Sequence, residues 1–543
     1  MTSNASIGDR DRPLHCSGLP DDGSDGSGSV VAFAAVTVAV GETLTLADVT
    51  AVAAGADATF SPKTREKVIS ARRVIEGAVA SGDVVYGVTT GFGALANVRI
   101  DPAQATDLQH GIVRSHATAV GRPLSRPEAR AMLLLRAHVL ALGHSGVRPE
   151  LIDLMVQMLN ADVIPAVPEQ GSLGASGDLA PLANLALPMI GAGEVLTDVA
   201  TEPAAGAMQR AGLAPLTLEA KEGLALVNGT QGMLAIGVLA AERLSTLART
   251  ADVVAAMTIE AALGTDAPFD DRLQRLRPHP GQAASASNLR LLLEGSPILA
   301  SHRDSEHLVQ DAYSLRCAPQ VHGATRDALG FARGVLEIEL NAVSDNPIVL
   351  PAGGDIVSGG NFHGQPVAVA MDLLALATVG MASISERRLY RLLDPALSNG
   401  LPPFLVPESG LNSGFMLAQY TAASLVSESK SLAHPASVDS IPSSAGQEDH
   451  VSMGMTAARH ARDVVANAEM VLALEALGAA QALDLRAPLE PGPATASVKE
   501  ALRHEVPFYE ADREFGPDIA AAVELVRSGR LVSAAEGVSS PLD

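Results

Sequence analysis

Three small residues, Ala175-Ser176-Gly177, stand in a glycine-rich stretch that reads GSLGASGDLAPLA from residue 171 to residue 183. If the backbone folds back tightly there, the amide nitrogen of Gly177 can attack the carbonyl carbon of Ala175, because glycine has no Cβ to block the approach. Loss of two waters, one of which includes the Ser176 hydroxyl, would leave a five-membered ring with an exocyclic methylidene, which is a strong electrophile. A simpler interpretation is a loop before a helix, with Ser176 or Asp178 as the N-cap.

Such an electrophile would suit the elimination of ammonia from an α-amino acid, which also needs a base for the β-proton and a cation for the carboxylate. Tyr86 is the candidate base and lies in the glycine-rich loop YGVTTGFG. Free tyrosine has a pKa of about 10, so a tyrosine base needs surroundings that favour the phenolate. The alternative is a structural tyrosine.

Arg316 is the candidate cation, because a guanidinium fork matches a planar carboxylate. Gln310, Tyr313 and Arg316 are spaced i, i+3, i+6, which places them near one face if this segment is a helical turn. The alternative is an exposed Gln310 and an Arg316 that pairs with Asp311.

The composition predicts that helices position these residues. Of the 543 residues, 47% are hydrophobic but only 3% are aromatic, with no tryptophan, so alanine and leucine must fill most of the interior. Long apolar-periodic segments exceed the usual helix length of about 11–12 residues and cover roughly 217–263, 320–344, 364–394, 411–432 and 451–484. They predict a mainly α-helical protein built around an extended bundle, whose outer stripes need a partner subunit for burial.

Shorter signals divide the chain further. Ser61-Pro62 and the capping box that begins at Ser125 predict helix starts, and residues 35–55 favour a short strand or hairpin. We expect a flexible tail over residues 1–30, an N-terminal region over 31–215 with both the tyrosine loop and the Ala-Ser-Gly loop, the long-helix bundle over 216–485 and a helical cap over 486–543.

The net charge of −23 disfavours nucleic-acid binding. The apolar stretch 224–241 is interrupted by polar residues, which indicates a core helix and no membrane span. Two cysteines and no apolar leader favour a reducing cytoplasm. His302, His307 and His322 form no tight ligand pattern, so we expect no metal.

The string GSLGASGDLAPLA closely resembles the signature of the ammonia-lyases and aminomutases that carry a 4-methylideneimidazol-5-one (MIO) prosthetic group. Other segments resemble the same family in the same order, namely VYGVTTGFGALA (85–96), LALVNGTQ (224–231), VQDAYSLRCAPQVHG (309–323), SDNPIV (344–349), GGNFHGQPVA (359–368) and HPASVDSIPSSAGQEDHVSMG (434–454). The resemblance implies a helical bundle related to the fumarase/aspartase group, with a small loop-rich N-terminal region that carries short strands. It also implies a homotetramer whose active sites are each assembled from three subunits.

The same resemblance implies a role for each matching residue. Ala175, Ser176 and Gly177 would form MIO, with no metal or diffusible cofactor, and Asp178 would help ring closure. Asn228 and Gln310 would contact the ring or the substrate amine, and Phe362 would pack near the ring. Tyr86 would be the base, Tyr313 would orient the substrate or handle protons, and Arg316 would bind the carboxylate.

The resemblance implies an amino acid substrate. Two residues bear on which amino acid it is. Glu448 in GQEDHVSMG resembles the histidine ammonia-lyases, and a carboxylate suits an imidazole N–H better than a bare phenyl ring. His116 is less decisive, because tyrosine-specific relatives can share it. Asn184, where many relatives have histidine, and Tyr420, in a string shared with tyrosine-specific relatives, leave alternatives open. These are a tyrosine ammonia-lyase and a tyrosine 2,3-aminomutase, beside a histidine ammonia-lyase that produces urocanate. A non-catalytic helical scaffold is a further alternative, which the intact Ala-Ser-Gly together with Tyr86 and Arg316 disfavours.

Overall fold

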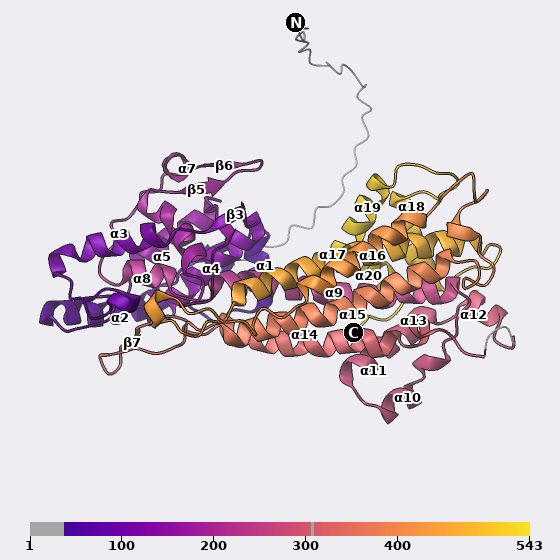
Figure 1. Cartoon of the computed structure of the whole chain (residues 1–543), viewed down its shortest axis with the longest axis horizontal. Coiled ribbons are helices and arrows are strands. Elements are labelled where there is room, and N and C mark those ends of the chain that lie inside the picture. The colour runs from indigo at the N-terminus through magenta and orange to yellow at the C-terminus, as the bar shows by residue number, and fades with distance from the viewer. Residues whose placement is uncertain (1–36, 306–308) are drawn as a thin grey trace, which may run out of the picture. The chain divides into compact units, whose positions relative to one another are not determined.

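Five long helices dominate the computed structural model, which describes residues 37–305 and 309–543 (Figure 1). They are α9 (Gln231–Ala261), α14 (Ala318–Leu340), α15 (Gln365–Leu393), α16 (Met416–Leu432) and α17 (Gly454–Leu485). Each long apolar-periodic segment predicted from the sequence overlaps one of them almost completely, and the expectation of a mainly helical fold is confirmed. The expected tail over residues 1–30 lies outside the described residues.

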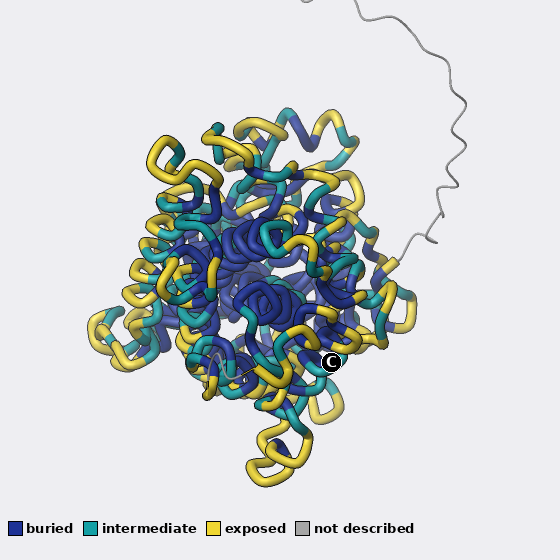
Figure 2. The backbone as a smooth tube through the Cα atoms, turned by 90° about the vertical axis from the view of Figure 1, so that its right-hand side faces the viewer, coloured by how far each residue is buried: buried dark blue, intermediate teal, exposed yellow. Residues whose placement is uncertain are grey.

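The long helices pack side by side, with α15, α17 and α9 in the centre of the bundle. Seen along the bundle, its centre is buried (Figure 2), and α9 and α17 are buried along most of their length. Alanine and leucine dominate these faces, and their small side chains allow close helix packing. At 1.5 Å per residue, the 31 residues of α9 span about 46 Å, which sets the distance between the groups at its two ends.

Two helix starts predicted from capping signals are confirmed. The helix α2 (Pro62–Ser81) begins after Ser61, whose side chain accepts a hydrogen bond from the Thr64 amide. The helix α4 (Arg126–Ala141) begins with a complete capping box between Ser125 and Glu128. In each case the side chain satisfies a backbone N–H that has no partner within its own helix.

Within the described part of the segment 35–55, residues 37–55, the structure has a strand but no hairpin. The strand β1 (Thr37–Ala39) pairs in parallel with β2 (Asp57–Thr59), and the helix α1 (Leu46–Ala53) lies between them. A capping box between Thr45 and Asp48 starts this helix and outweighs the β preference of the nearby valines and threonines. The other strand pairs are antiparallel, β3 (Val120–Pro123) with β4 (Pro168–Gln170), β5 (Glu194–Leu196) with β6 (Thr201–Pro203) and β7 (Ile348–Leu350) with β8 (Asp355–Val357).

Shorter helices complete the described residues. They are α3 (Ala105–His116), α5 (Pro149–Asn160), α6 (Leu179–Ala186), α7 (Ala204–Arg210), α8 (Glu222–Val227), α10 (Asp271–Leu276), α11 (Pro280–Leu293), α12 (Pro297–Ser301), α13 (Tyr313–Arg316), α18 (Pro493–Glu505), α19 (Gly516–Arg527) and α20 (Arg530–Glu536). Residues 37–543 cluster as one unit, so the boundaries expected near 215 and 485 stay predictions.

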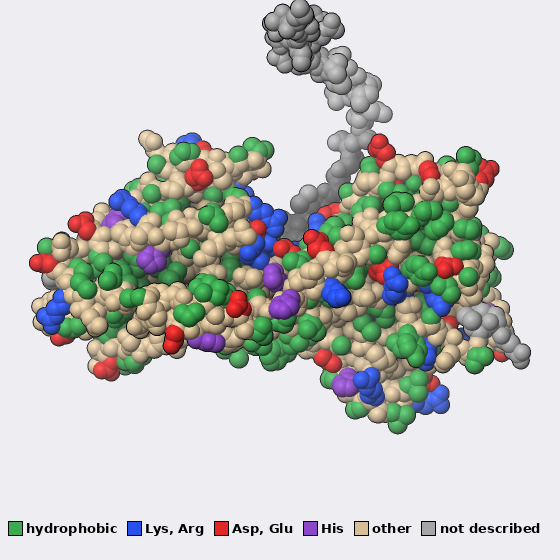
Figure 3. Space-filling view, viewed as in Figure 1, with side chains coloured by type: hydrophobic (Ala, Val, Ile, Leu, Met, Phe, Trp, Pro, Cys, Tyr) green, Lys and Arg blue, Asp and Glu red, His purple; other side chains and the backbone are tan. Residues whose placement is uncertain are grey.

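Helix α15 is long and apolar enough to cross a membrane by length and composition alone. However, 56% of its most apolar stretch is buried within the protein, where α15 packs against α14, α16 and α17. Its outer face leaves Val369, Leu373 and Leu376 exposed, and hydrophobic side chains are visible over the bundle between the charged groups (Figure 3). We call these three residues the α15 stripe.

Candidate active site

The loop that holds Ala175-Ser176-Gly177 is folded into a tight turn. Ser176 and Gly177 both have left-handed backbone conformations, with φ of 49° and 76°. Gly229 brackets the turn, because its N–H donates to the Ser176 carbonyl at 3.2 Å and its own carbonyl accepts from the Asp178 N–H at 2.7 Å. A Cβ added to Gly177 would overlap that carbonyl, so glycine is required where the attacking nitrogen would be. This geometry fits the formation of an MIO ring from these residues.

Asp178 is buried behind this turn and contacts the start of a second helix. Its carboxylate accepts hydrogen bonds from the Ser172 hydroxyl at 2.9 Å and from the Met233 N–H, in the first turn of α9, at 2.8 Å. It stands at the N-cap position of α6 but makes no capping bond to that helix, so the simple N-cap interpretation is wrong. Burial raises the pKa of Asp178 to about 6 and outweighs these donors.

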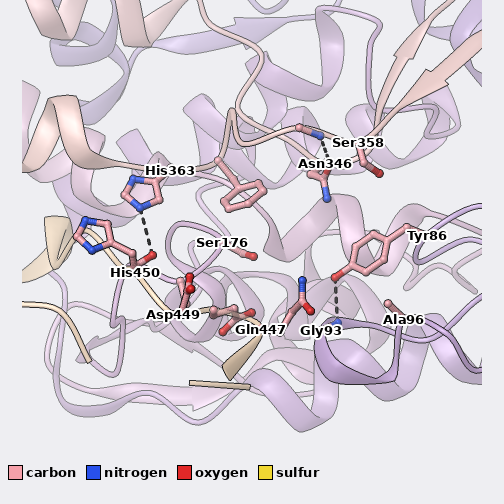
Figure 4. Close-up of a pocket in the computed structure, with 14 residues that line it drawn as sticks. Tyr86, Gly93, Ala96, Ser176, Asn346, Ser358, His363, Gln447, Asp449 and His450 are labelled. Atoms are coloured by element: carbon pink, nitrogen blue, oxygen red, sulfur yellow. Dashed lines mark hydrogen bonds between the residues drawn. The ribbon is translucent and has the colours of Figure 1, made fainter. Parts of the chain in front are cut away.

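A cavity of about 450 Å³ opens beside the turn. Five of the residues predicted from the sequence line it, namely Tyr86, Ala175, Ser176, Phe362 and Glu448. Figure 4 shows Ser176 and Tyr86 on the walls of this cavity, with His363 and His450 at another side. The structure thus brings together segments that lie up to 364 positions apart in the sequence, from Tyr86 to His450.

Tyr86 is half-buried at one wall of the cavity. Its hydroxyl oxygen accepts the N–H of Gly93 at 3.0 Å, and its ring meets the edge of Phe92. Gly93 has a φ of 54°, and the next residue, Ala94, donates its N–H to the Ser444 hydroxyl at 3.2 Å. The tyrosine loop is therefore tied to the segment that carries Glu448.

Glu448 lies where two cavities meet. The second cavity, of about 290 Å³, is lined by His116 and also by Ala175 and Glu448. The Ser443 hydroxyl donates to the Glu448 carboxylate at 2.8 Å and holds it in place. Burial lowers the pKa of His116, and the negative charge of Glu448 opposes this shift. The two residues singled out for substrate choice therefore interact across the Ala-Ser-Gly turn.

Asn228 lies next to Gly229, directly behind the turn. Its side-chain NH₂ donates to Asp345 Oδ1 at 3.1 Å and to the Asn346 carbonyl at 2.9 Å. Its Oδ1 is buried and has no hydrogen-bond partner in the described part of the chain. A buried amide oxygen without a partner is costly, and it is suited to an N–H of a group that joins the site later.

Gln310, Tyr313 and Arg316 lie far from this cavity in the same chain. Asn228 precedes α9, whereas Thr265 follows its other end and donates its N–H to Asp311 at 2.8 Å. About 46 Å of helix therefore separates the two groups, and α13 lies at the opposite end of the bundle from α8 (Figure 1).

The far-end residues are arranged differently from the prediction in one respect. Gln310 precedes the short helix α13, so the three residues do not share one helical face. Tyr313 is 71% exposed, and the Arg316 guanidinium lies 4.6 Å from the centre of its ring.

Sequence reasoning missed several residues that line the larger cavity. They are Asn346, Ser358, His363, Gln447, Asp449 and His450. The rings of His363 and His450 are stacked, with centres 5.9 Å apart. Most of them lie in the family-like strings SDNPIV, GGNFHGQPVA and GQEDHV, so closer attention to each polar residue of those strings could have found them. None of the lining residues in the described part is a lysine or an arginine.

Comparisons with known proteins agree with this geometry. The profile of the family described as aromatic amino acid lyase matches residues 44–504. A histidine ammonia-lyase of Anaeromyxobacter sp. (strain K) is 57% identical over 502 residues, which cover 90% of this chain and 98% of the relative. One of Sorangium cellulosum is 53% identical over 513 residues, with 93% and 100% covered.

Solved structures give the same result. The crystal structure of histidine ammonia-lyase from Trypanosoma cruzi superposes with a TM-score of 0.86 at 43% identity and covers 93% of this chain and 96% of that one. Tyrosine aminomutase from Streptomyces globisporus superposes with a TM-score of 0.89 at 40% identity, with 94% and 100% covered. The chain belongs to the aromatic amino acid lyase family.

Proposed function

We propose that this protein is a histidine ammonia-lyase, a carbon–nitrogen lyase that eliminates ammonia from L-histidine and releases trans-urocanate. The observation that carries the proposal is that the left-handed Ser176 turn, Tyr86 and Glu448 line one cavity. The high identity to histidine ammonia-lyases over almost their whole length supports histidine as the substrate.

The prosthetic group in this proposal is MIO, formed from Ala175, Ser176 and Gly177. When formed, it supplies an electrophile that captures the substrate nitrogen and makes it a better leaving group. Asp178 assists ring closure, because a carboxyl with a pKa of about 6 can both give and take a proton near neutral pH. Ser172 and Met233 hold that carboxyl in place.

Tyr86 removes the β-proton of the substrate. Its oxygen faces the same cavity as Ser176 and is held in position by the Gly93 N–H. Glu448 accepts the imidazole N–H of histidine, and Ser443 fixes its carboxylate for that bond. His116 lines the neighbouring cavity, and the negative charge of Glu448 raises its pKa against the effect of burial. A phenol or phenyl side chain would leave this carboxylate with a weaker partner or with none.

The substrate carboxylate needs a cation, and no lysine or arginine lines the cavity among the described residues. Arg316 supplies it from a neighbouring copy of the chain, together with Gln310 and Tyr313. A homotetramer with shared active sites would also cover the exposed α15 stripe and the exposed side chains of Phe331 and Ile338 on α14. Exposed apolar rows of this kind are typical of subunit interfaces. We place the enzyme in the cytoplasm, as the low cysteine content favours.

The experiment is incubation of the purified protein with L-histidine while the absorbance of urocanate is recorded, together with the intact mass of the chain. We expect urocanate to accumulate and the chain to be lighter than its sequence by two water molecules. Ser176→Ala is the matched control, which keeps the full mass and gives no product. If the protein gives no urocanate from L-histidine but gives coumarate or β-tyrosine from L-tyrosine, then the substrate is tyrosine and the proposal of a histidine ammonia-lyase is wrong. That alternative remains open because tyrosine aminomutases superpose as well as the histidine enzyme.

A further inference from the structure

Behind the Ala-Ser-Gly turn lies a buried ion pair with no part in the chemistry described so far. Lys221 Nζ and Asp345 Oδ2 are 2.8 Å apart, and both side chains are fully buried. The second oxygen of this carboxylate, Oδ1, accepts from the Asn228 side-chain NH₂ at 3.1 Å and from the Asn346 N–H at 2.7 Å. The pair thus touches a residue of the candidate site directly.

The partners of Asn228 determine which way its amide faces. Its NH₂ group has two hydrogens, and both are directed at atoms that only accept, Asp345 Oδ1 and the Asn346 carbonyl. If the amide were turned over, its oxygen would face these two oxygens, and two hydrogen bonds would become two repulsive contacts. The orientation therefore follows from the chemistry of the neighbours.

This orientation leaves Asn228 Oδ1 as a buried acceptor without a partner in the described part of the chain. Asn228 is only 2% exposed, so bulk water does not supply the missing hydrogen bond to its Oδ1. Gly229 contacts both Ser176 and Asp178, and Asn346 lines the cavity. The free acceptor therefore belongs to a residue that adjoins the turn through Gly229 and the cavity wall through Asn346.

Lys221 holds the Asp345 carboxylate in place as the acceptor that the Asn228 NH₂ faces. Without the Lys221 ammonium, the buried Asp345 carboxylate would be an unpaired charge, which is costly, and its Oδ2 would have lost the partner that fixes the carboxylate against Asn228. Burial lowers the pKa of Lys221, and the charge of Asp345 opposes this shift. Arg136, also fully buried, fixes the backbone here, because it donates to the Asn228 carbonyl at 3.0 Å.

We infer that Lys221 and Asp345 are positioning residues, which lock the Asn228 amide so that its Oδ1 accepts an N–H from the amino group of the bound substrate. This inference rests on the proposed function, since it needs an amino acid in the cavity. It goes further by assigning an atom, a direction of hydrogen bonding and the two residues that impose it.

The first test uses the single variants Asp345→Asn and Lys221→Met. In Asp345→Asn, an amide that gives its oxygen to Lys221 sets its NH₂ against the Asn228 NH₂ and the Asn346 N–H, so Asn228 loses an acceptor and is no longer held in one orientation. Loss of one hydrogen bond to a charged amine corresponds to a fall in kcat/KM of roughly 10- to 100-fold. We expect both variants still to lose the mass of two waters, because the turn itself keeps its partners.

Binding without turnover supplies the second measurement. In a Ser176→Ala background, where no ring can form, Asp345→Asn should weaken the Kd for L-histidine by roughly 10-fold in calorimetry. Glu475→Gln in the same background is the matched control. It breaks another fully buried pair, Arg388 with Glu475, which lies in the bundle and outside the cavity. We expect it to lower stability but to leave the Kd unchanged.

Two neutral double variants protect the test against misfolding, because neither buries an unpaired charge. Lys221→Met with Asp345→Asn keeps an acceptor at position 345, since the freed amide can turn its oxygen towards Asn228. Lys221→Met with Asp345→Leu removes that acceptor. We expect the Kd of the first to be close to that of the parent and the Kd of the second to be roughly 10-fold weaker.

Equal affinity in the two double variants, or an equal loss in Glu475→Gln, would overturn the inference. Wild-type protein that neither loses two waters nor releases urocanate would instead overturn the proposed function. A wild type that turns over, with Asp345 variants that bind and react as well as it does, would remove the positioning role alone.

Discussion

The two ends of helix α9 carry complementary sets of side chains. At its N-terminal end, the cavity is lined by the Ala-Ser-Gly turn, Tyr86, Glu448 and Asp449, with no lysine or arginine in the described part. At its C-terminal end, Arg316 and the exposed Tyr313 lie next to each other, outside that cavity. An amino acid substrate needs both an electrophile and a cation, so each end of the bundle holds what the other lacks.

The two ends also differ in how they are held. The cavity end is fixed by buried contacts within the chain, such as those of Asp178 with Ser172 and Met233. The far end displays a large aromatic side chain that is 71% exposed. An exposed tyrosine over an arginine is typical of a surface that a partner covers. The difference supports the proposal that a complete site requires at least two copies of the chain.

The sharpest test of this comparison uses two variants that are each inactive, Ser176→Ala and Arg316→Met. The first removes the electrophile at one end, and the second removes the cation at the other. If the two ends meet across a subunit interface, co-expression yields some sites with an intact Ser176 from one copy and an intact Arg316 from another. We expect urocanate production to return from background to a readily measured fraction of wild type.

The control is a mixture of the two variants that were purified separately and combined without exchange of subunits, which should stay inactive. Co-expressed Ser176→Ala and Tyr86→Phe should show no more activity than Tyr86→Phe alone, because both residues lie at the same end. Activity above that of Tyr86→Phe in that second combination, or none in the first, would contradict the division between the ends.

The next largest effect is expected for Tyr86→Phe alone. It keeps the ring against Phe92 but removes the oxygen that takes the β-proton, and a positioned base contributes about 10²- to 10⁴-fold. The measurement is kcat with L-histidine, alongside the intact mass to show that the ring still forms. Tyr390→Phe, in α15 and outside the cavity, is the matched control. A similar loss in both variants would mean that Tyr86 is structural.

Much of each separate end could be predicted from the sequence, because the signals are local. The period of apolar residues gave the long helices, Ser61 and Ser125 gave two helix starts, and the glycines around Ser176 indicated a tight turn. Local signals failed where a contact joins distant segments. Asp178 accepts an N–H in the first turn of α9 and makes no capping bond to α6, the helix that follows it. The partner, Met233, is 55 positions away in the sequence, so no local pattern predicts this contact.

The relation between the ends could not be predicted from spacing alone. Arg316 and Ser176 both lie in glycine- or proline-flanked segments, and only the length of α9 shows that one chain cannot bring them together. The even spacing of Gln310, Tyr313 and Arg316 was misleading because α13 is a single turn that begins at Tyr313. Likewise, the valines and threonines near Thr45 favoured β structure, whereas one capping box starts a helix there.

A smaller effect is expected at Asp178, in the dependence of stability on pH. Burial raises the pKa of Asp178 from 3.8 to about 6, so between these values the folded state keeps a proton that the unfolded state releases. Stability from this residue therefore falls as pH rises from 4 to 6 and is level above that. A shift of about two units corresponds to about 3 kcal/mol.

The variant for this test is Asp178→Asn, which has no proton to release. Its free energy of unfolding in denaturant, relative to wild type, should rise between pH 4 and pH 7. Asp57→Asn, on an exposed strand residue, should show no such trend. A flat difference at Asp178 would mean that its carboxyl is not buried as the cavity end requires.

The smallest effect is expected for the electrostatic link between Glu448 and His116. Burial lowers the pKa of His116, and the charge of Glu448 partly opposes this. Glu448→Gln removes that charge with little change in shape, so the pKa of His116 should fall further, as measured by titration of its imidazole signal in NMR. The reference signal is His138, whose pKa burial lowers to about 4 and which should keep its value in the variant. If the His116 signal also stays unchanged, the charge of Glu448 does not act on His116 and the electrostatic link between the two residues fails, although the electrophile and base at this end would remain.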